Sequence, residues 1–557
     1  MKIKKLLAVV LSVVVALGSL SLAACNDEKM ANDGKTIDVK IIKSGYGTAW
    51  FEGIAEKFET LYAEEGYKVN MLTPSNSYGG ETVLLEMRNY KNEDTADLYI
   101  VEGVYADDVI DMEYGICVED LNEVYEKGAI SFDGTVSDTP IKDTKGGKLY
   151  NYMVTDPLNE NKYYSYLWHA SMSGLVVNTK VLSDYGFDYM PNTTDEMFKM
   201  YDAIYNGANG KDGTKDESGI FPTTWGGENA YGYTYATMMI NLASMLGHDG
   251  WEDFFTLDNV RDDIKNGYKY YEEIKPELKS AIKTFIKAND VMYSYTGSTT
   301  QRHDMAHAQL VMGNAAFMSN GSYFYNEVKS NFSKYLSNVR IIPVPMVSEF
   351  GVMLKLDGSG NDAKKCDEIL SYLCGCFDSG MNQAEMLDAV KGKFSGITFT
   401  EEQIQKVWEA RGITYQNLQG HAYISKNSDV KEPATLLLRM MASEDAANLM
   451  AEYSLPAPFA DTTLTEFDHE FISDVMTLKE RLNHSFFLYQ PRGLRSEINM
   501  ETLGYISANF VSETNASIGV EQDISNRDYD YWAEYFYNKI NDNVKTNWEK
   551  YITNAGY

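Results

Sequence analysis

The chain is poor in cysteine, in basic residues and in long apolar segments. Five cysteines among 557 residues are too few for a disulfide scaffold in a protein of this size. Its 49 lysines and arginines face 81 acidic residues, which gives a formal net charge of −32. Such a negative field repels phosphate backbones, so nucleic acid is not expected as a partner. After residue 22, no run is long and apolar enough to predict a membrane span.

Motifs of common catalytic and metal sites are also missing. The chain has no G-x-S-x-G turn, no Walker phosphate loop and no context typical of a catalytic cysteine. His303 and His307 have the spacing of a zinc-protease helix, but Asp304 is shorter than the glutamate that motif uses and no third ligand follows. We therefore expect these residues on a helix surface. Residues 357–368 resemble a calcium loop, yet Asp362 stands where the tight turn needs glycine, so a solvated turn is favoured. We expect no metal and no cofactor.

A basic and then apolar leader opens the chain. Three lysines within the first five residues precede the apolar run 6–22, and two alanines stand directly before Cys25. This layout resembles a bacterial lipoprotein signal, in which the cysteine carries fatty acyl chains such as palmitate and becomes the first residue. The sequence predicts a signal peptide over 1–24 and a polar tether over 25–35. The predicted location is the extracellular face of a cell membrane of the Gram-positive type, with the lipid as the only membrane attachment.

The first folded segment has the pattern of a β-α-β unit. Ile37, Val39 and Ile41 alternate with polar residues as in a strand, residues 50–61 have helical apolar spacing, and residues 69–71 alternate again. Such strands are expected to be parallel, with ligands beyond their carboxyl ends. A third strand over 97–102 follows. Its end and residues 44–47 are therefore the predicted ligand edges.

Five segments together resemble one protein family. They are similar, in order and spacing, to segments of the extracellular solute-binding proteins of ABC importers, in particular the carbohydrate group of the maltose-binding type. These segments are 39–62, 96–121, 174–197, 312–324 and 422–457. The resemblance covers most of the chain after the tether, except about 348–418, which has the pattern of a helical insertion, and the carboxyl-terminal part.

The resemblance implies an α/β fold with two lobes, a ligand cleft between them and crossing hinge segments. It places the first lobe at 36–168 and 425–453, and the second at 172–420 and 458–557, with the insertion over 348–418. Hinges are then expected near Ser171, Ala422 and Pro456. Closure of such lobes on a ligand presents both of them to a permease.

The resemblance also implies a saccharide ligand and ABC permease subunits as partners, with no enzymatic activity. A sugar offers hydroxyls around apolar faces, so its site needs aromatic rings together with polar side chains. The chain has 41 tyrosines, 23 phenylalanines and 7 tryptophans, more rings than a core requires. The candidate ligand contacts are Tyr46, Trp50, Glu102, Tyr105, Trp168, His169, Trp225, Glu228, Tyr231, Tyr233 and Tyr323.

Two alternatives remain open at this point. A secreted glycoside hydrolase would share an aromatic cleft, but it needs two carboxylates at a defined separation. Capture of a peptide or another solute would keep the binding role with a different ligand.

Overall fold

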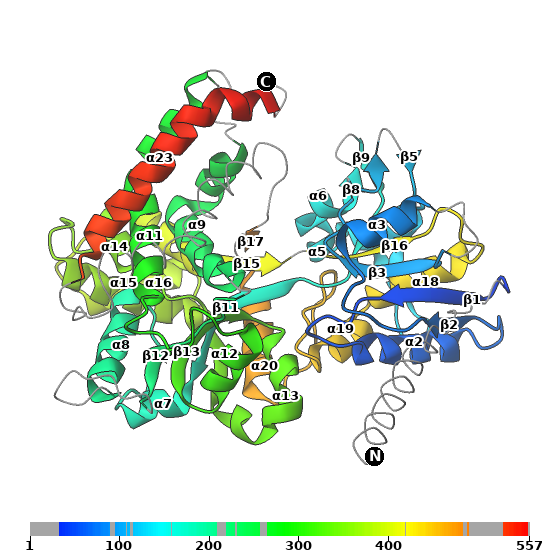
Figure 1. Ribbon diagram of the computed structural model, residues 1–557, viewed down its shortest axis with the longest axis horizontal. Helices are drawn as coiled ribbons and strands as arrows, with labels where there is room; N and C mark the ends of the chain where they lie inside the picture. Colours follow the sequence, from blue (N-terminus) through cyan, green and yellow to red (C-terminus); the bar gives the residue numbers. More distant parts are fainter. Residues whose placement is uncertain are drawn as a thin grey trace, which may run out of the picture.

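Two sheets organise the protein in the computed structural model (Figure 1). The structure describes residues 33–554, except 90–94, 107, 112–114, 157–158, 209–218, 229–230, 257–264, 418, 483–486 and 489–526. Cys25 and the predicted signal and tether up to residue 32 lie outside the described residues. We refer to the first sheet with the helices packed on it as the first lobe, and to the second sheet with its helices as the second lobe. The two lobes lie side by side (Figure 1).

The first sheet contains the predicted β-α-β unit. Its strand order is β10-β16-β3-β1-β2. Strand β1 pairs in parallel with β2 and with β3, and helix α2 joins the first two strands. The alternation of apolar residues and the helical spacing therefore predicted this unit correctly. The strands are β1 (Thr36–Ile41), β2 (Lys68–Met71), β3 (Leu98–Glu102), β10 (Tyr166–Leu167) and β16 (Gly420–Ile424).

Helices from two distant parts of the chain cover the first sheet. Helix α2 (Ala49–Leu61) buries its apolar face against α18 (Lys431–Met441) and α19 (Glu444–Ala451) in one core cluster. The remaining first-lobe elements are α3 (Gly80–Arg88), β4 (Ile110–Asp111), β5 (Gly115–Ile116), α4 (Asn122–Tyr125), β6 (Gly128–Ile130), β7 (Val136–Pro140), η1 (Ile141–Asp143), α5 (Lys145–Leu149), α6 (Asn151–Val154), β8 (Thr155–Asp156) and β9 (Asn159–Tyr163).

The second sheet is built around the long strand β11. Strand β11 pairs antiparallel with β13, β14 and β15, and β12 pairs in parallel with β13. The strands are β11 (Ser171–Asn178), β12 (Phe221–Thr223), β13 (Ala315–Gly321), β14 (Val339–Ile342), β15 (Thr414–Asn417) and β17 (Phe487–Leu488).

Helices dominate the rest of the second lobe. The segment predicted as an insertion contains α14 (Ser348–Met353), α15 (Ala363–Asp378), α16 (Gln383–Lys393) and α17 (Glu401–Arg411). The carboxyl-terminal helix α23 (Tyr529–Asn554) runs along the outer edge of this lobe (Figure 1). The others are α7 (Thr179–Asp184), α8 (Thr194–Ala208), α9 (Tyr231–Thr256), α10 (Tyr270–Glu273), α11 (Lys275–Ala288), α12 (His303–Val311), α13 (Phe324–Phe332), η3 (Ser333–Asn338) and α20 (Glu470–Arg481).

Helix α8 begins at Thr194, and the side chains of Thr193 and Glu196 accept backbone N–H groups at this end of the helix. The Thr193 hydroxyl accepts the Glu196 N–H at 3.4 Å. The Glu196 carboxylate accepts the N–H of Asn192 at 2.8 Å.

The chain passes between the sheets at three places. It leaves β10 for β11 through residues 168–170, and it leaves β15 for β16 between residues 417 and 420. The third passage follows α19, where Pro456 O accepts the N–H of Ala170 at 3.3 Å. The passage between residues 417 and 420 thus precedes Ala422, near which a hinge was expected, and Ala422 itself lies inside β16.

Four cysteines, Cys117, Cys366, Cys374 and Cys376, are buried. Burial raises the pKa of the Cys374 thiol to about 12, so this side chain packs as a small apolar group. Within the part of the chain that the structure describes, no helix has the length and apolar character of a membrane span.

Candidate functional site

A cavity of about 550 Å³ lies between the two lobes. On the first lobe it is bounded by the loop after β1, by Asn76 and by Glu102 at the end of β3. On the second lobe its walls are the amino-terminal turns of α12 and residues 326–332 of α13. The cavity therefore lies at the carboxyl ends of two parallel strands, which is where the β-α-β pattern predicted a ligand edge.

Close contacts join the lobes beside this cavity. The Tyr46 hydroxyl lies 2.6 Å from the Ser322 hydroxyl of the second lobe. Ser322 Oγ also accepts the N–H of Met172 in β11 at 3.2 Å. The loop after β1 is thus connected directly to the strand by which the chain enters the second lobe.

Gly45 lies close to the start of α13 in the second lobe. A Cβ atom at this position would lie 2.8 Å from Glu327 Oε1 and 3.0 Å from Tyr323 Cβ. The first distance is shorter than real Cβ contacts and the second is tighter than most of them, so an alanine here would require the Glu327 carboxylate to turn aside and Tyr323 to shift by a few tenths of an ångström. Tyr323 directly precedes α13, is half-buried, and meets the Tyr46 ring edge-on at 6.3 Å. The structure thus brings Tyr46 and Tyr323 together from opposite lobes.

Glu102 and His169 form a second group at the cavity. Glu102 lines the cavity, and its Oε1 lies 3.6 Å from Nε2 of His169. His169 is almost fully buried, and neither of its ring nitrogens has a hydrogen-bond partner among the described residues. The Tyr46 and His169 ring centroids are 5.7 Å apart. Three of the predicted residues therefore lie next to one another at this edge.

Glu327 and His307 face each other on the second-lobe wall. Their Oε2 and Nδ1 atoms are 3.5 Å apart. Burial, together with the charge of Asp304, raises the pKa of Glu327 to about 7. Burial, together with His303, lowers the pKa of His307 to about 3, with a small opposing effect of Asp304. Because both shifts favour the neutral forms, this contact is not an ion pair at neutral pH.

The structure corrects the helix-surface prediction for His307, whereas His303 is partly exposed. His307 is only 2% exposed, and its Nε2 accepts from Asn320 Nδ2 at 2.8 Å. His303 and Asp304 both line the cavity. Among the described residues, no group of three or more His, Cys, Asp or Glu side chains has an arrangement that could hold a metal ion.

Asp357 and Glu368, the ends of the calcium-like segment, have other partners. The Asp357 carboxylate accepts backbone N–H groups of its own turn, including that of Ser359 at 2.8 Å. The Ser359 hydroxyl also donates to this carboxylate at 2.7 Å, and this bond, followed by the backbone bonds, holds the pKa of Asp357 well below the usual range. Glu368 pairs with Lys365 at 2.8 Å.

Trp50 and Trp168 are core residues, which corrects their prediction as ligand contacts. Their rings stack 5.1 Å apart with an interplanar angle of 7°, and both are essentially unexposed. Their indole N–H groups donate to Gly47 O and Val101 O, each at 3.1 Å. Because both ring faces and both donors are used inside the first lobe, a ligand has no access to them in this conformation.

Trp225 and Glu228 of the second lobe do not line the cavity. Trp225 is buried in the largest apolar cluster, and its indole N–H donates to Ser294 Oγ at 2.8 Å, so the predicted contact is again replaced by packing. Glu228 is exposed. Tyr231 and Tyr233 belong to α9, and their side chains lie outside the described residues.

Tyr105, the remaining candidate, follows the end of β3. It is half-buried, and its ring lies 5.5 Å from that of His421 in β16. Tyr105 does not belong to the cavity wall.

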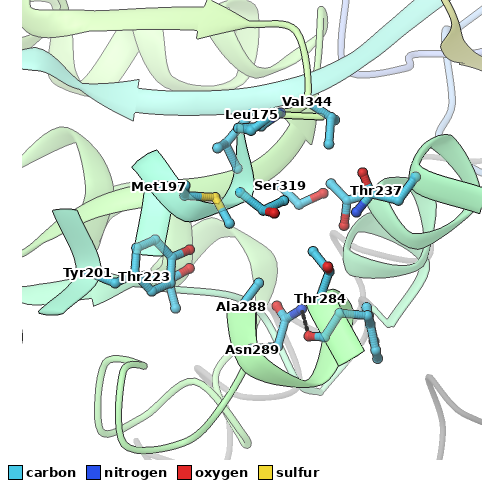
Figure 2. Close-up of a pocket in the computed structure, with 14 residues that line it drawn as sticks. Leu175, Met197, Tyr201, Thr223, Thr237, Thr284, Ala288, Asn289, Ser319 and Val344 are labelled. Atoms are coloured by element: carbon cyan, nitrogen blue, oxygen red, sulfur yellow. Dashed lines mark hydrogen bonds between the residues drawn. The ribbon is translucent and has the colours of Figure 1, made fainter. Parts of the chain in front are cut away.

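A second, internal cavity lies within the second lobe. Side chains from α8, α9, α11 and β13 surround it, including Thr237, Thr284 and Ser319 (Figure 2). Its volume of about 30 Å³ suits a single water molecule held by hydroxyl and amide groups. It is too small for a saccharide.

Solved structures share this fold. The maltose-bound protein MalE3 of T. maritima is 16% identical, with a TM-score of 0.52 over 92% of this chain and 99% of its own. RafE of Streptococcus pneumoniae is 12% identical, with a TM-score of 0.50 over 93% of this chain and 99% of its own. A solute-binding protein of an ABC transporter from Thermotoga lettingae, bound with α-D-tagatose, is 13% identical. Its TM-score is 0.50 over 91% of this chain and 99% of its own.

No model of a known protein family matches the chain. No curated protein matches it in sequence. The structural similarity, at these low identities, establishes the fold: the chain has the two-lobed α/β architecture of ABC solute-binding proteins, as the resemblance predicted.

Proposed function

We propose that this protein is the saccharide-binding subunit of an ABC importer. The observation that carries the proposal is the cavity of about 550 Å³ between the lobes, which falls in the size range of small-molecule sites. Its wall is rich in side chains that bind hydroxyl groups, from Ser44, Asn76, Glu102, Asn326 and Glu327. The fold shared with solved solute-binding proteins supports the same conclusion.

Binding would proceed by closure. Groups at the ends of β1 and β3 capture the ligand, and α12 and α13 then complete its hydrogen bonds. The closed state is selected because only there does a ligand touch both walls. Tyr46 and Gly45, which already meet the second lobe, mark where the moving surfaces join.

The test is a thermal-shift screen with panels of saccharides and peptides. A saccharide that raises the melting temperature supports the proposal, because a ligand that binds only the folded state stabilises it by mass action. Stabilisation by peptides alone would favour the other solute class. A protein stabilised by no saccharide would contradict the proposal.

Lipid attachment at Cys25 and delivery to permease subunits complete the proposal. Both are supported by the leader sequence and the resemblance. Cys25→Ser should release the protein from the membrane fraction, since the lipid would be its only attachment. A Cys25→Ser protein that still sediments with membranes would argue against lipidation, whereas a soluble one with intact saccharide binding agrees with it.

Glycoside hydrolysis is the second candidate function. Glu102 and Glu327 face the same cavity from opposite lobes, and the raised pKa of Glu327, about 7, suits a general acid. Incubation of the bound saccharide with stoichiometric protein decides between the two. Recovery of intact saccharide supports the binding role, and release of new reducing ends supports the hydrolase.

A further inference from the structure

The carboxylates of the cavity lack cationic partners within the protein. Elsewhere, acids of similar exposure are paired: Glu119 lies 2.6 Å from Lys431, and Asp474 lies 2.6 Å from Arg340. In the described part of the chain, neither Glu102 nor Glu327 has a lysine or arginine nitrogen within 4 Å, and each faces only a histidine ring. A half-buried carboxylate without a cation is unfavourable.

The carboxylates of Glu102 and Glu327 both lie near Tyr46, which contacts the second lobe. Burial raises the pKa of the Tyr46 hydroxyl, and the charges of Glu102 and Glu327 raise it further. The two acids come from opposite lobes: Glu102 Oε1 lies 3.6 Å from Nε2 of His169, whose ring centroid is 5.7 Å from that of Tyr46, and a Cβ atom at Gly45, next to Tyr46, would lie 2.8 Å from Glu327 Oε1. Closure brings like charges toward each other unless a proton or a cation is placed between them.

Two neighbouring buried acceptors on α13 also lack donors. Glu327 Oε2 and Asn326 Oδ1 are shielded from solvent and have no hydrogen-bond partner among the described residues. The Asn326 amide nitrogen donates to Tyr453 O, which leaves Oδ1 as the unpartnered acceptor of this side chain. A ligand that satisfies this wall must bring hydrogen-bond donors. A hydroxyl brings one donor with further lone pairs, whereas an ammonium brings three donors and no acceptor.

The other charged groups at the cavity do not supply the missing cation. Lys43 is exposed on the first-lobe side, and Asp304 pairs with Arg302 at 3.3 Å. His303 and His307 complete the titratable groups of the wall, and the lowered pKa of His307 keeps its ring neutral.

We propose that the saccharide bound in this cavity carries a free amino group, whose ammonium lies between Glu102 and Glu327. This inference rests on the proposed function and narrows its ligand class to amino sugars. The ammonium replaces the missing counter-charge, lets the lobes close without like-charge repulsion, and donates to the unpartnered acceptors of α13.

The test is calorimetry at pH 7 with matched pairs of saccharides. Glucose, galactose, mannose and the β-1,4-linked tetramer of glucose are compared with their 2-amino counterparts. At least one amino member should bind at least tenfold more tightly than its neutral counterpart. Its binding should release protons from Glu327, seen as a dependence of the heat on the ionisation enthalpy of the buffer.

Two variants separate the ammonium contact from general effects. Glu327→Gln keeps the shape of the side chain. In this variant the amino saccharide should bind less than threefold more tightly than its neutral counterpart. Glu402→Gln, at a carboxylate that is 75% exposed on α17, is the matched control and should leave it unchanged. The inference is overturned if neutral members bind as tightly as amino members, or if the preference survives Glu327→Gln. Binding of neutral saccharides alone would leave the proposed function standing and remove this inference, whereas failure of every member would remove both.

Discussion

Gly45→Ala should weaken ligand binding by obstructing closure. The new methyl group would meet Glu327 Oε1 at 2.8 Å and Tyr323 Cβ at 3.0 Å. The carboxylate can swing aside, but the Tyr323 Cβ is fixed to its backbone, so α13 must move or the lobes must stay further apart. Overpacking of this kind costs about 1 to 3 kcal/mol. If the contact forms only on closure, affinity falls by about 5- to 150-fold.

Calorimetry with the best ligand of the screen measures this loss, and Gly392→Ala is the matched control. Gly392 lies in α16, and a Cβ there would meet no atom within 4 Å. The control should keep full affinity. The melting temperature of unliganded Gly45→Ala should stay close to that of the wild type, because without a ligand the lobes are expected to stand further apart at this contact. Unchanged affinity in Gly45→Ala, or an equal loss in Gly392→Ala, would refute this reasoning.

Three further predictions concern single side chains. Tyr323→Ala should lower affinity by about thirtyfold, or about 2 kcal/mol, while the unliganded melting temperature stays nearly constant; the reverse pattern in calorimetry would make Tyr323 a packing residue. Trp50→Ala should destabilise the protein by about 3 to 5 kcal/mol in denaturant unfolding, because Trp50 stacks on Trp168 inside the core, and a marginal effect would contradict that placement. Glu327→Gln should gain stability relative to the wild type as pH rises from 5 to 8. The reason is that the folded-state pKa of Glu327 is raised to about 7 from 4.5, so the folded wild type loses a stabilising proton over this range. Melting temperatures of both proteins across that range check the sign; the lowered pKa of His307 affects both proteins alike and cancels in the difference.

The sequence predicted the first-lobe edge of the cavity because that edge depends on local pattern. Alternation in β1 and β3 identified the strands, and the residues after them, Tyr46 and Glu102, followed from the rule that ligands lie at carboxyl ends of parallel strands. The resemblance added Tyr323 on the opposite lobe. Tyr46 and Glu102 required only the strand order and the chain direction, whereas Tyr323 depended on the resemblance.

The second-lobe wall could not be predicted in the same way. Helical spacing shows that His303 and His307 share a face of α12, but only tertiary packing decides that this face meets Asn320 and α13. Glu327 lies four residues after Tyr323, so it falls on the same side of the helix start. That spacing was a usable signal, although among 81 acidic residues it carried little weight without the fold.

Aromatic residues near strand ends misled for a related reason. Trp50 and Trp168 lie far apart in sequence, so nothing local reveals that each covers the other. Trp225 is also a core residue that the sequence could not identify as one, because its indole N–H donates to Ser294, which lies in a distant segment. A ring at a ligand edge can therefore be part of the core, and only its long-range contacts show which.

The central claim is that a saccharide binds between the lobes and holds them closed. Small-angle X-ray scattering with and without the best saccharide of the screen tests it most directly. The account predicts that the radius of gyration falls at saturating ligand in the wild type and falls less in Gly45→Ala. A ligand shown by calorimetry to be bound, with a radius of gyration that does not change, would contradict it.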